Sequence, residues 1–95
     1  MPAAMETVQL RITGRVQGVG YRFWATRMAA RLGLRGWVRN RADGTVEALV
    51  TGAPQEVAAM IEACRQGPAG AWVAEVTASR DEDDGSVGFV ALPSE

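Results

Sequence analysis

The 95-residue sequence contains no histidine, no lysine and only one cysteine, Cys64. The lack of histidine excludes Ser-His-Asp triads, Cys-His pairs and histidine-ligated metals. A single cysteine cannot form an internal disulfide or a cysteine-rich metal site. Without lysine, Schiff-base chemistry and the lysine-containing phosphate loop are excluded as well. Any catalysis must therefore use arginine, amide, hydroxyl, carboxylate or backbone groups.

Long apolar runs are also missing, since no stretch approaches the ~20 residues of a membrane-spanning helix. Residues 1–5 have neither a basic region nor an apolar stretch, so we expect no signal peptide. Hydrophobic residues make up 47% and charged residues 22% of the chain, which is typical of a globular protein. We expect one domain over residues 1–95, with 1–5 as a flexible head and a core at about 6–92, in a cytoplasmic protein without membrane contact.

The ten basic residues are all arginines, and they are distributed unevenly along the chain. Residues 1–41 contain eight arginines against one acid, a net charge of +7, whereas residues 42–95 contain two arginines against ten acids, a net charge of −8. Two interpretations remain open. Either the basic half faces an anion, such as a nucleic acid or a small phosphate, or the two halves attract each other across the fold.

Hydrophobic periodicity predicts five strands and two helices. Apolar residues alternate at positions 8, 10 and 12, as in a half-buried strand, whereas the apolar spacing from Tyr21 to Leu32 follows one stripe of a helix. In chain order, the predicted elements are a strand over 7–13, a helix from Tyr21 that stops at Gly33, strands over 34–41 and 45–51 joined by an Asp43-Gly44 turn, a helix between Gly52-Ala53-Pro54 and Gly67-Pro68, and strands over 72–79 and 87–92.

The element order is therefore β-α-β-β-α-β with a short extra strand at the C-terminus. Two helices with one apolar stripe each can cover one face of an antiparallel sheet, which predicts a ferredoxin-like sandwich of the α+β class. Right-handed crossovers place the first and third strands beside each other at the centre of this sheet. The pairing of the last strand does not follow from the pattern.

A glycine-rich turn separates the first strand from the first helix. Gly18 and Gly20 allow several backbone N–H groups to point into one concavity, and this concavity lies at a helix N-terminus, which favours an anion. Arg22 begins the helix at the same place, and its planar guanidinium suits a phosphate. The alternative is an ordinary tight turn followed by a surface arginine.

Asn40 is the second candidate side chain. It shares strand parity with Leu34 and Val38, which we expect to face the helices, and a polar amide on that face needs a partner. If the first two strands run parallel, their carboxyl ends meet, and Asn40 lies near the glycine-rich turn. The alternative is that Asn40 only caps the Asp43-Gly44 hairpin.

These two segments resemble the signature segments of the acylphosphatases, which are roughly G-x-V-Q-G-V-x-[FY]-R and G-[FYW]-[AVC]-x-N. The stretch from Gly14 to Arg22 matches the first and the stretch from Gly36 to Asn40 matches the second, both without a gap. The similarity extends over about residues 6–92. It implies an enzyme that hydrolyses the carboxyl–phosphate bond of acyl phosphates and needs neither a metal nor a cofactor.

The resemblance also implies a role for each site residue. Arg22 and the backbone N–H groups of the loop bind the phosphate, and Asn40 holds the attacking water. The implied substrate is a small acyl phosphate rather than a nucleic acid, and we expect a monomer. The loop residues are Val16, Gln17, Gly18, Val19, Gly20 and Tyr21.

Several other side chains have ordinary interpretations. Cys64 lies on the apolar stripe of the second helix and is expected in the core. The acidic run 81–84 matches no calcium-loop pattern and is expected to be a solvated turn. Trp24 and Trp37 could either line a patch for an acyl group or pack around arginines at the surface.

Two rival functions use the same element order. RNA-recognition domains share it, but they stack bases on aromatic residues of the central strands, and the first and third strands have no aromatic residue here. The other rival is a catalytically silent regulatory domain that binds a small anion.

Overall fold

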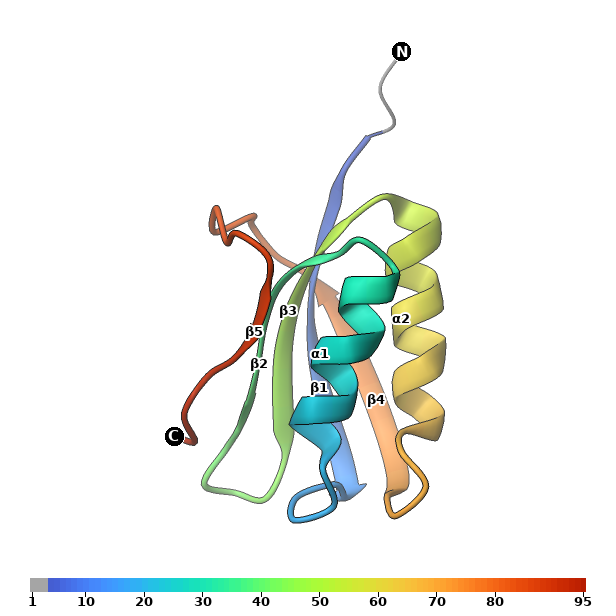
Figure 1. Cartoon of the computed structure of the whole chain (residues 1–95), viewed down its shortest axis with the longest axis vertical. Helices are drawn as coiled ribbons and strands as arrows, with labels where there is room; N and C mark the ends of the chain where they lie inside the picture. The colour runs from blue at the N-terminus through green and yellow to red at the C-terminus, as the bar shows by residue number, and fades with distance from the viewer. Residues whose placement is uncertain (1–3) are drawn as a thin grey trace.

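Residues 4–95 are described by the computed structural model, in which two helices cover one face of a five-stranded sheet (Figure 1). The predicted element order and ferredoxin-like fold are confirmed. The expected flexible head lies largely outside the described residues, and Ala4 and Met5 are exposed. The elements are β1 (Glu6–Arg15), α1 (Tyr21–Arg31), β2 (Arg35–Asn40), β3 (Val46–Gly52), α2 (Pro54–Gln66), β4 (Trp72–Arg80) and β5 (Phe89–Ala91).

The sheet has the strand order β4-β1-β3-β2-β5, so β1 and β3 lie at the centre as predicted. Strands β1 to β4 are paired antiparallel, but β5 runs parallel to β2, which makes the sheet mixed rather than antiparallel throughout. The direction of β5 has a simple cause. The chain leaves β4 at one end of the sheet, crosses to the opposite edge at that same end and must then run back, which is the direction of β2 (Figure 1).

The core lies between the sheet and the two helices, and the predicted apolar stripes supply it. Each fully buried aliphatic or aromatic side chain contributes roughly 1.5–3 kcal/mol to folding. Cys64 is 1% exposed, which confirms its predicted place in the core. The other buried residues of this cluster are Val8, Leu10, Ile12, Val16, Tyr21, Ala25, Ala29, Leu34, Val38, Val46, Ala48, Val50, Val57 and Met60.

Strand β3 is buried on both faces, which the alternating pattern did not predict. Glu47 lies on the face away from the helices and is only 5% exposed. Its carboxylate accepts hydrogen bonds from the Arg39 Nε at 2.8 Å, from an Arg41 guanidinium nitrogen at 3.2 Å and from the Gln9 side chain. A buried carboxylate needs such partners. The long side chains of neighbouring strands and of the hairpin therefore cover the centre of this face.

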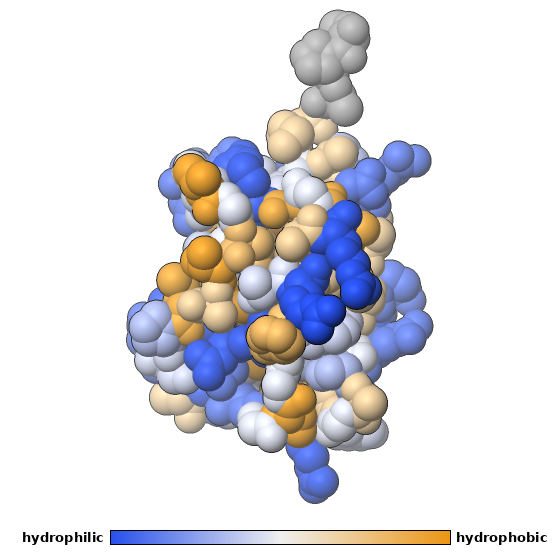
Figure 2. Space-filling view, in the orientation of Figure 1, coloured by the Kyte–Doolittle hydropathy of each residue, from blue (hydrophilic) through white to orange (hydrophobic). Residues whose placement is uncertain are grey.

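Arginines of the basic half pair with carboxylates of the acidic half. Arg11 contacts Asp43 at 3.1 Å, and Arg39 contacts the side chain of Glu95 at 2.7 Å. Arg35 pairs with Asp83 in the segment between β4 and β5. The interpretation in which the two halves attract each other is thus supported for these residues. Helix α1 contains no acid, and strongly hydrophilic side chains gather over it (Figure 2).

The topology brings three connections to one end of the molecule. Strands β1 and β2 are both antiparallel to β3. They therefore run in the same direction, and their C-terminal ends lie at the same end of the sheet. The loop after β1 and the β2–β3 hairpin therefore lie side by side, near the α2–β4 connection (Figure 1). The expected meeting of the carboxyl ends of β1 and β2 is confirmed. Within residues 4–95, neither helix is long and apolar enough to cross a membrane.

Candidate active site

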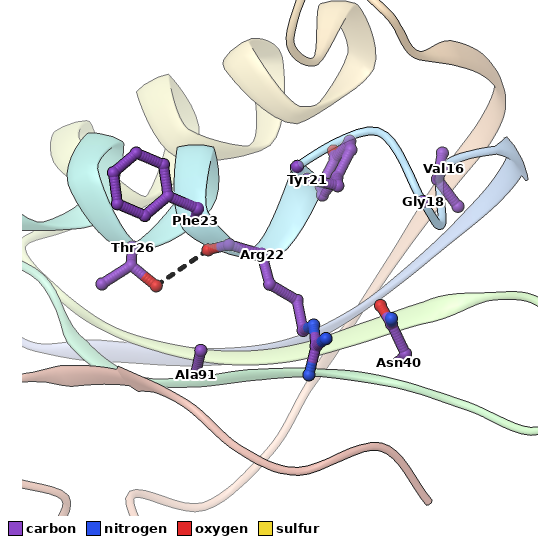
Figure 3. A pocket seen from close by; sticks show the side chains of 9 residues that line it. Val16, Gly18, Tyr21, Arg22, Phe23, Thr26, Asn40 and Ala91 are labelled. Carbon is purple, nitrogen blue, oxygen red and sulfur yellow. Dashed lines mark hydrogen bonds between the residues drawn. The ribbon is translucent and has the colours of Figure 1, made fainter.

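A cleft of about 500 Å³ lies between the start of α1 and the neighbouring strands β2 and β5 (Figure 3). The structure brings Arg22 and Asn40 together in its wall, although they lie on different elements. Of the predicted loop residues, Val16, Gly18, Gly20 and Tyr21 also line the cleft, whereas Gln17 and Val19 do not.

The backbone conformation of the loop explains its glycines. Gly18 and Gly20 have φ angles of +74° and +77°, in the left-handed region that costs other residues about 1–2 kcal/mol. Gly20 is the N-cap of α1. In the described part of the chain no side chain caps this helix end, and the first turn contains no acid. The first N–H groups of α1 are therefore open to an anion, which the helix dipole also favours.

Two side chains of the loop, those of Gln17 and Val19, are anchored away from the cleft. Val19 packs against the hydrophobic core. The Gln17 side-chain amide donates hydrogen bonds to the carbonyl oxygens of Arg41 and Thr45, at 2.8 and 2.9 Å. Gln17 thereby ties the loop to the hairpin that follows Asn40. This side-chain role was not predicted from the sequence.

Arg22 is half-buried, and the C-terminal segment holds it in place. One of its terminal nitrogens donates a hydrogen bond to the carbonyl oxygen of Leu92 at 3.0 Å. The Leu92 N–H in turn donates to the carbonyl oxygen of Val38 at 2.8 Å, which fastens this segment to β2. Among residues 4–95, no carboxylate pairs with Arg22, so its positive charge is available to an anion in the cleft.

Asn40 ends β2 with its side-chain amide directed into the cleft, beside the Arg22 guanidinium (Figure 3). The alternative that Asn40 only caps the hairpin is not supported, because Asp43 performs that task. The Asp43 Oδ1 accepts hydrogen bonds from the backbone N–H of Thr45 at 3.0 Å and from its hydroxyl at 2.7 Å. The Asn40 amide thus faces the same space as the open N-terminus of α1.

Two titratable groups near the loop remain neutral at physiological pH. The Tyr21 hydroxyl donates a hydrogen bond to the carbonyl oxygen of Cys64 at 2.8 Å. Burial raises the pKa of the Cys64 thiol to about 11, and burial together with the neighbouring Cys64 raises the pKa of Tyr21 above its usual range. Neither group supplies a base or nucleophile near pH 7.

The acidic segment 81–84 is attached to the sheet rather than only solvated. Asp83 pairs with Arg35, and Asp84 accepts a hydrogen bond from the Trp37 indole nitrogen at 3.1 Å. Across the described residues 4–95, no three histidine, cysteine, aspartate or glutamate side chains cluster closely enough to hold a metal ion.

Neither tryptophan considered for the acyl group lines the cleft. Trp24 packs edge-on against Tyr21 with ring centroids 5.2 Å apart, and Trp37 lies under the Arg39 guanidinium at 4.9 Å. The cleft is instead completed by Phe23, Thr26 and Ala91, which the sequence analysis missed. Helical spacing could have indicated Thr26, which lies four positions after Arg22 and three after Phe23, so that it neighbours both on the surface of α1.

Comparisons with known proteins agree with the fold and the cleft. The acylphosphatase family profile matches residues 8–91. The acylphosphatase of Rhizobium etli is 59% identical over 71 residues, which cover 75% of this chain and 76% of the relative. That of Rhodospirillum rubrum is 50% identical over 90 residues, which cover 95% and 99%. The crystal structure of acylphosphatase from Bacillus subtilis superposes with a TM-score of 0.89 at 30% identity, covering 94% of this chain and 99% of that one.

The fold and the cleft define a small α+β domain of the ferredoxin-like kind, with a cleft at the start of its first helix whose charge and N–H donors suit an anion. The relatives identify it more closely: the chain belongs to the acylphosphatase family. The family and the enzyme class expected from the two signature segments are confirmed.

Proposed function

We propose that this protein hydrolyses acyl phosphates in the cleft between α1 and β2, with Arg22 and the loop backbone holding the phosphate and Asn40 holding the water. The observation that carries the proposal is the convergence of three groups on one cleft: an arginine that has no acidic partner within residues 4–95, an open helix N-terminus and a side-chain amide. Positive charge and N–H donors suit the phosphate, and the amide suits a neutral water molecule.

The reaction needs no strong protein base. The water oxygen attacks phosphorus, the bond from phosphorus to the acyl oxygen breaks, and its electron pair leaves with the carboxylate. The proton of the water passes to a phosphate oxygen, so an acyl phosphate dianion and water give a carboxylate and dihydrogen phosphate. Because the leaving carboxylate is weakly basic and the transition state is loose, positioning and charge stabilisation supply most of the catalysis.

Asn40 orients the water and does not deprotonate it. An amide is not a base at neutral pH, but its carbonyl oxygen accepts a hydrogen bond from water. Arg22 contributes its charge, and its hydrogen bond to Leu92 leaves other guanidinium donors for phosphate oxygens. The two residues therefore have separable tasks, one toward the water and one toward the phosphate.

A paired substitution tests this division. Arg22→Gln is expected to lower the turnover rate by about 10³-fold and to weaken inorganic phosphate binding, because the transferred phosphoryl group loses a positive charge. Asn40→Ala is expected to lower turnover by about 10²-fold while phosphate affinity stays within a few-fold of the parent. The measurements are single-turnover rates with benzoyl phosphate in the presence of a chelator, and a phosphate-competition binding curve.

The matched control is Arg31→Gln, which removes the same charge from the exposed C-terminal end of α1 and should leave both readouts unchanged. A folded Asn40→Ala protein that keeps most of its rate would contradict the water-orienting role. If that variant instead loses phosphate binding as severely as Arg22→Gln, Asn40 contacts the substrate and the division of tasks is wrong. A parent protein that binds phosphate but releases none from benzoyl phosphate would favour the silent regulatory domain.

The nucleic-acid alternative is less well supported. Strands β1 and β3 carry no aromatic residue on which bases could stack. Three of the arginines on the open face of the sheet and its hairpin, Arg11, Arg39 and Arg41, are paired with carboxylates. The proposed substrate is therefore a small acyl phosphate.

We also propose that the protein acts as a monomer in the cytoplasm. All the groups proposed for the site come from one chain, so a second copy is not required for the chemistry. The single cysteine is a free buried thiol, as is typical of proteins from a reducing compartment. Light scattering should give a mass near 10.1 kDa, and a mass twice as large would contradict the monomer.

A further inference from the structure

The cleft extends well beyond the residues proposed to bind the phosphate. Gly18 and Asn40 lie at one end, Arg22 lies in the middle, and Thr26 and Ala91 lie toward the other end (Figure 3). A volume of about 500 Å³ falls in the range of sites for whole small molecules, so it exceeds what a phosphate group alone occupies. The far end is therefore available to the part of a substrate that carries the phosphate.

We propose that Phe23, Thr26 and Ala91 form a subsite for the acyl group, and that it selects an uncharged apolar acyl group, such as an aromatic one. This inference rests on the acyl phosphate hydrolysis proposed above, and it concerns the substrate class at that same site. It assigns to Phe23 a specificity-determining role that is separate from phosphate binding.

The chemistry of these side chains favours apolar contact. Phe23 is 67% exposed although it is a large aromatic residue, so covering its ring with a ligand removes apolar surface from water. Ala91 offers only a methyl group. The Thr26 hydroxyl already donates a hydrogen bond to the carbonyl oxygen of Arg22 at 2.8 Å, so its proton is not available to a ligand.

The Phe23 ring is also held in position. The Arg27 guanidinium lies 5.5 Å from the ring centroid, a distance at which a cation is attracted to an aromatic face. Arg27 itself does not line the cleft. Among the described residues 4–95, Arg22 is the only charged residue in the cleft wall, so an acyl group with its own carboxylate would find no second cation in that wall.

Helix α1 connects the proposed phosphate site with the proposed acyl subsite. Residues 22, 23 and 26 come from the first two turns of α1, so a phosphate bound by Arg22 and the helix N-terminus leads directly to Phe23 and Thr26. Strand β5 supplies Ala91 from the opposite side and thus closes the far end between α1 and the sheet.

The test compares benzoyl phosphate with acetyl phosphate in the parent, in Phe23→Ala and in Trp72→Ala. Phe23→Ala should lower the ratio of kcat/KM for benzoyl phosphate to that for acetyl phosphate by about 5- to 10-fold, through a higher KM for benzoyl phosphate. Turnover of acetyl phosphate and inhibition by inorganic phosphate should change less than about 2-fold, because the phosphate contacts remain. Trp72→Ala is a matched control, since Trp72 is also 67% exposed but lies on β4 outside the cleft, and it should leave the ratio unchanged.

Two results would overturn the subsite. An unchanged ratio in Phe23→Ala would mean that the acyl group lies elsewhere, and an equal loss with both substrates would mean that Phe23 acts on Arg22 instead. Calorimetric binding of benzoylphosphonate and acetylphosphonate, which cannot be hydrolysed, separates this proposal from the catalytic one. Suppose that the parent binds benzoylphosphonate more tightly than acetylphosphonate and that this preference depends on Phe23. If the parent then hydrolyses neither benzoyl phosphate nor acetyl phosphate, the result would contradict the proposed function and support the subsite.

Discussion

At the scale of single residues, a side chain outside the cleft connects the two parts of the proposed site. Gln17 belongs to the loop that lines the cleft, but its side-chain amide donates hydrogen bonds to two backbone carbonyl groups of the β2–β3 hairpin. These carbonyls belong to Arg41, which directly follows Asn40, and to Thr45 on the other side of the hairpin turn. Gln17 therefore sets the distance between the proposed phosphate-binding loop and the proposed water-binding amide, and a displacement of about 1 Å there can cost up to 10²-fold in rate.

Replacing Gln17 with alanine should lower turnover by about 10-fold per folded molecule, while inorganic phosphate affinity falls only a few-fold. The loop N–H groups and Arg22 remain, but the loop loses its link to the hairpin. The measurements are single-turnover rates and phosphate binding, under conditions where circular dichroism shows a folded protein.

The matched control for Gln17 is Gln9→Ala. Gln9 is also a glutamine with a hydrogen-bonded side chain, but its partner is Glu47, away from the cleft. Loss of either glutamine is expected to lower stability by roughly 0.5–1.5 kcal/mol for each hydrogen bond that is removed. If Gln17→Ala is merely less stable and keeps the parent turnover rate, as Gln9→Ala should, Gln17 has no positioning role.

At the scale of elements, the pairing of β2 with β3 positions Asn40 at the cleft. Gly36 in β2 has a φ of +138°, and a Cβ atom there would lie 1.8 Å from the carbonyl oxygen of Leu49 in β3. No side chain fits at that distance without separating the strands. The signature glycine four residues before Asn40 is thus explained by strand packing rather than by substrate binding.

Gly36→Ala should lower the free energy of unfolding by more than about 3 kcal/mol, because it combines an unfavourable φ with a backbone clash. Gly44→Ala in the hairpin is the comparison. Gly44 also has a left-handed φ, +90°, but its Cβ would meet nothing within 4 Å, so a loss of about 1–2 kcal/mol is expected. Urea denaturation of the two variants and the parent measures the difference, and equal losses would contradict the strand-packing explanation.

At the scale of the whole molecule, opposite charges join the two halves of the chain and place the C-terminal segment. Arg35 in β2 and the N–H of Gly85 hydrogen-bond to Asp83, and these contacts lower the pKa of the Asp83 carboxyl. Ser86 and Trp37 lower the pKa of Asp84 in the same way. These contacts hold the segment that leads into β5. This strand supplies Ala91 to the cleft, and the residue after it, Leu92, accepts the hydrogen bond from Arg22.

The lowered pKa values of Asp83 and Asp84 determine how the stability of the fold changes with pH. A carboxyl whose pKa is lower in the folded state contributes stability above its unfolded pKa, about 3.9, and this contribution is lost as the pH falls through the folded pKa. Asp83→Asn should therefore unfold at lower urea concentration than the parent at pH 6, and the difference should shrink below about pH 4.

Glu82→Gln is the matched control for Asp83→Asn, because it removes the same charge from the same segment without breaking an ion pair with a described residue. Its urea midpoint should follow that of the parent at each pH. If Asp83→Asn also follows the parent at pH 6, the pair with Arg35 does not stabilise the fold in solution.

Much of this structure could be predicted from local patterns. Alternation in β1 and the helical stripe from Tyr21 define which faces are buried, because side-chain direction depends only on the backbone period. Handedness and strand parity then placed Asn40 beside the glycine-rich turn. These inferences succeeded because each uses a regular repeat or a short connection.

By itself, the sequence determined the element order, the central position of β1 and β3, the anion-favouring start of α1 and the face on which Asn40 lies. Only the tertiary structure decided the parallel pairing of β5, the burial of Glu47 and the hydrogen bond from Arg22 to Leu92, which joins residues 70 positions apart. The physical reason is the range of the interactions. Local periodicity indicates which side of a helix or strand faces the core. The pairing of a short edge strand such as β5 depends instead on the path of the entire chain before it.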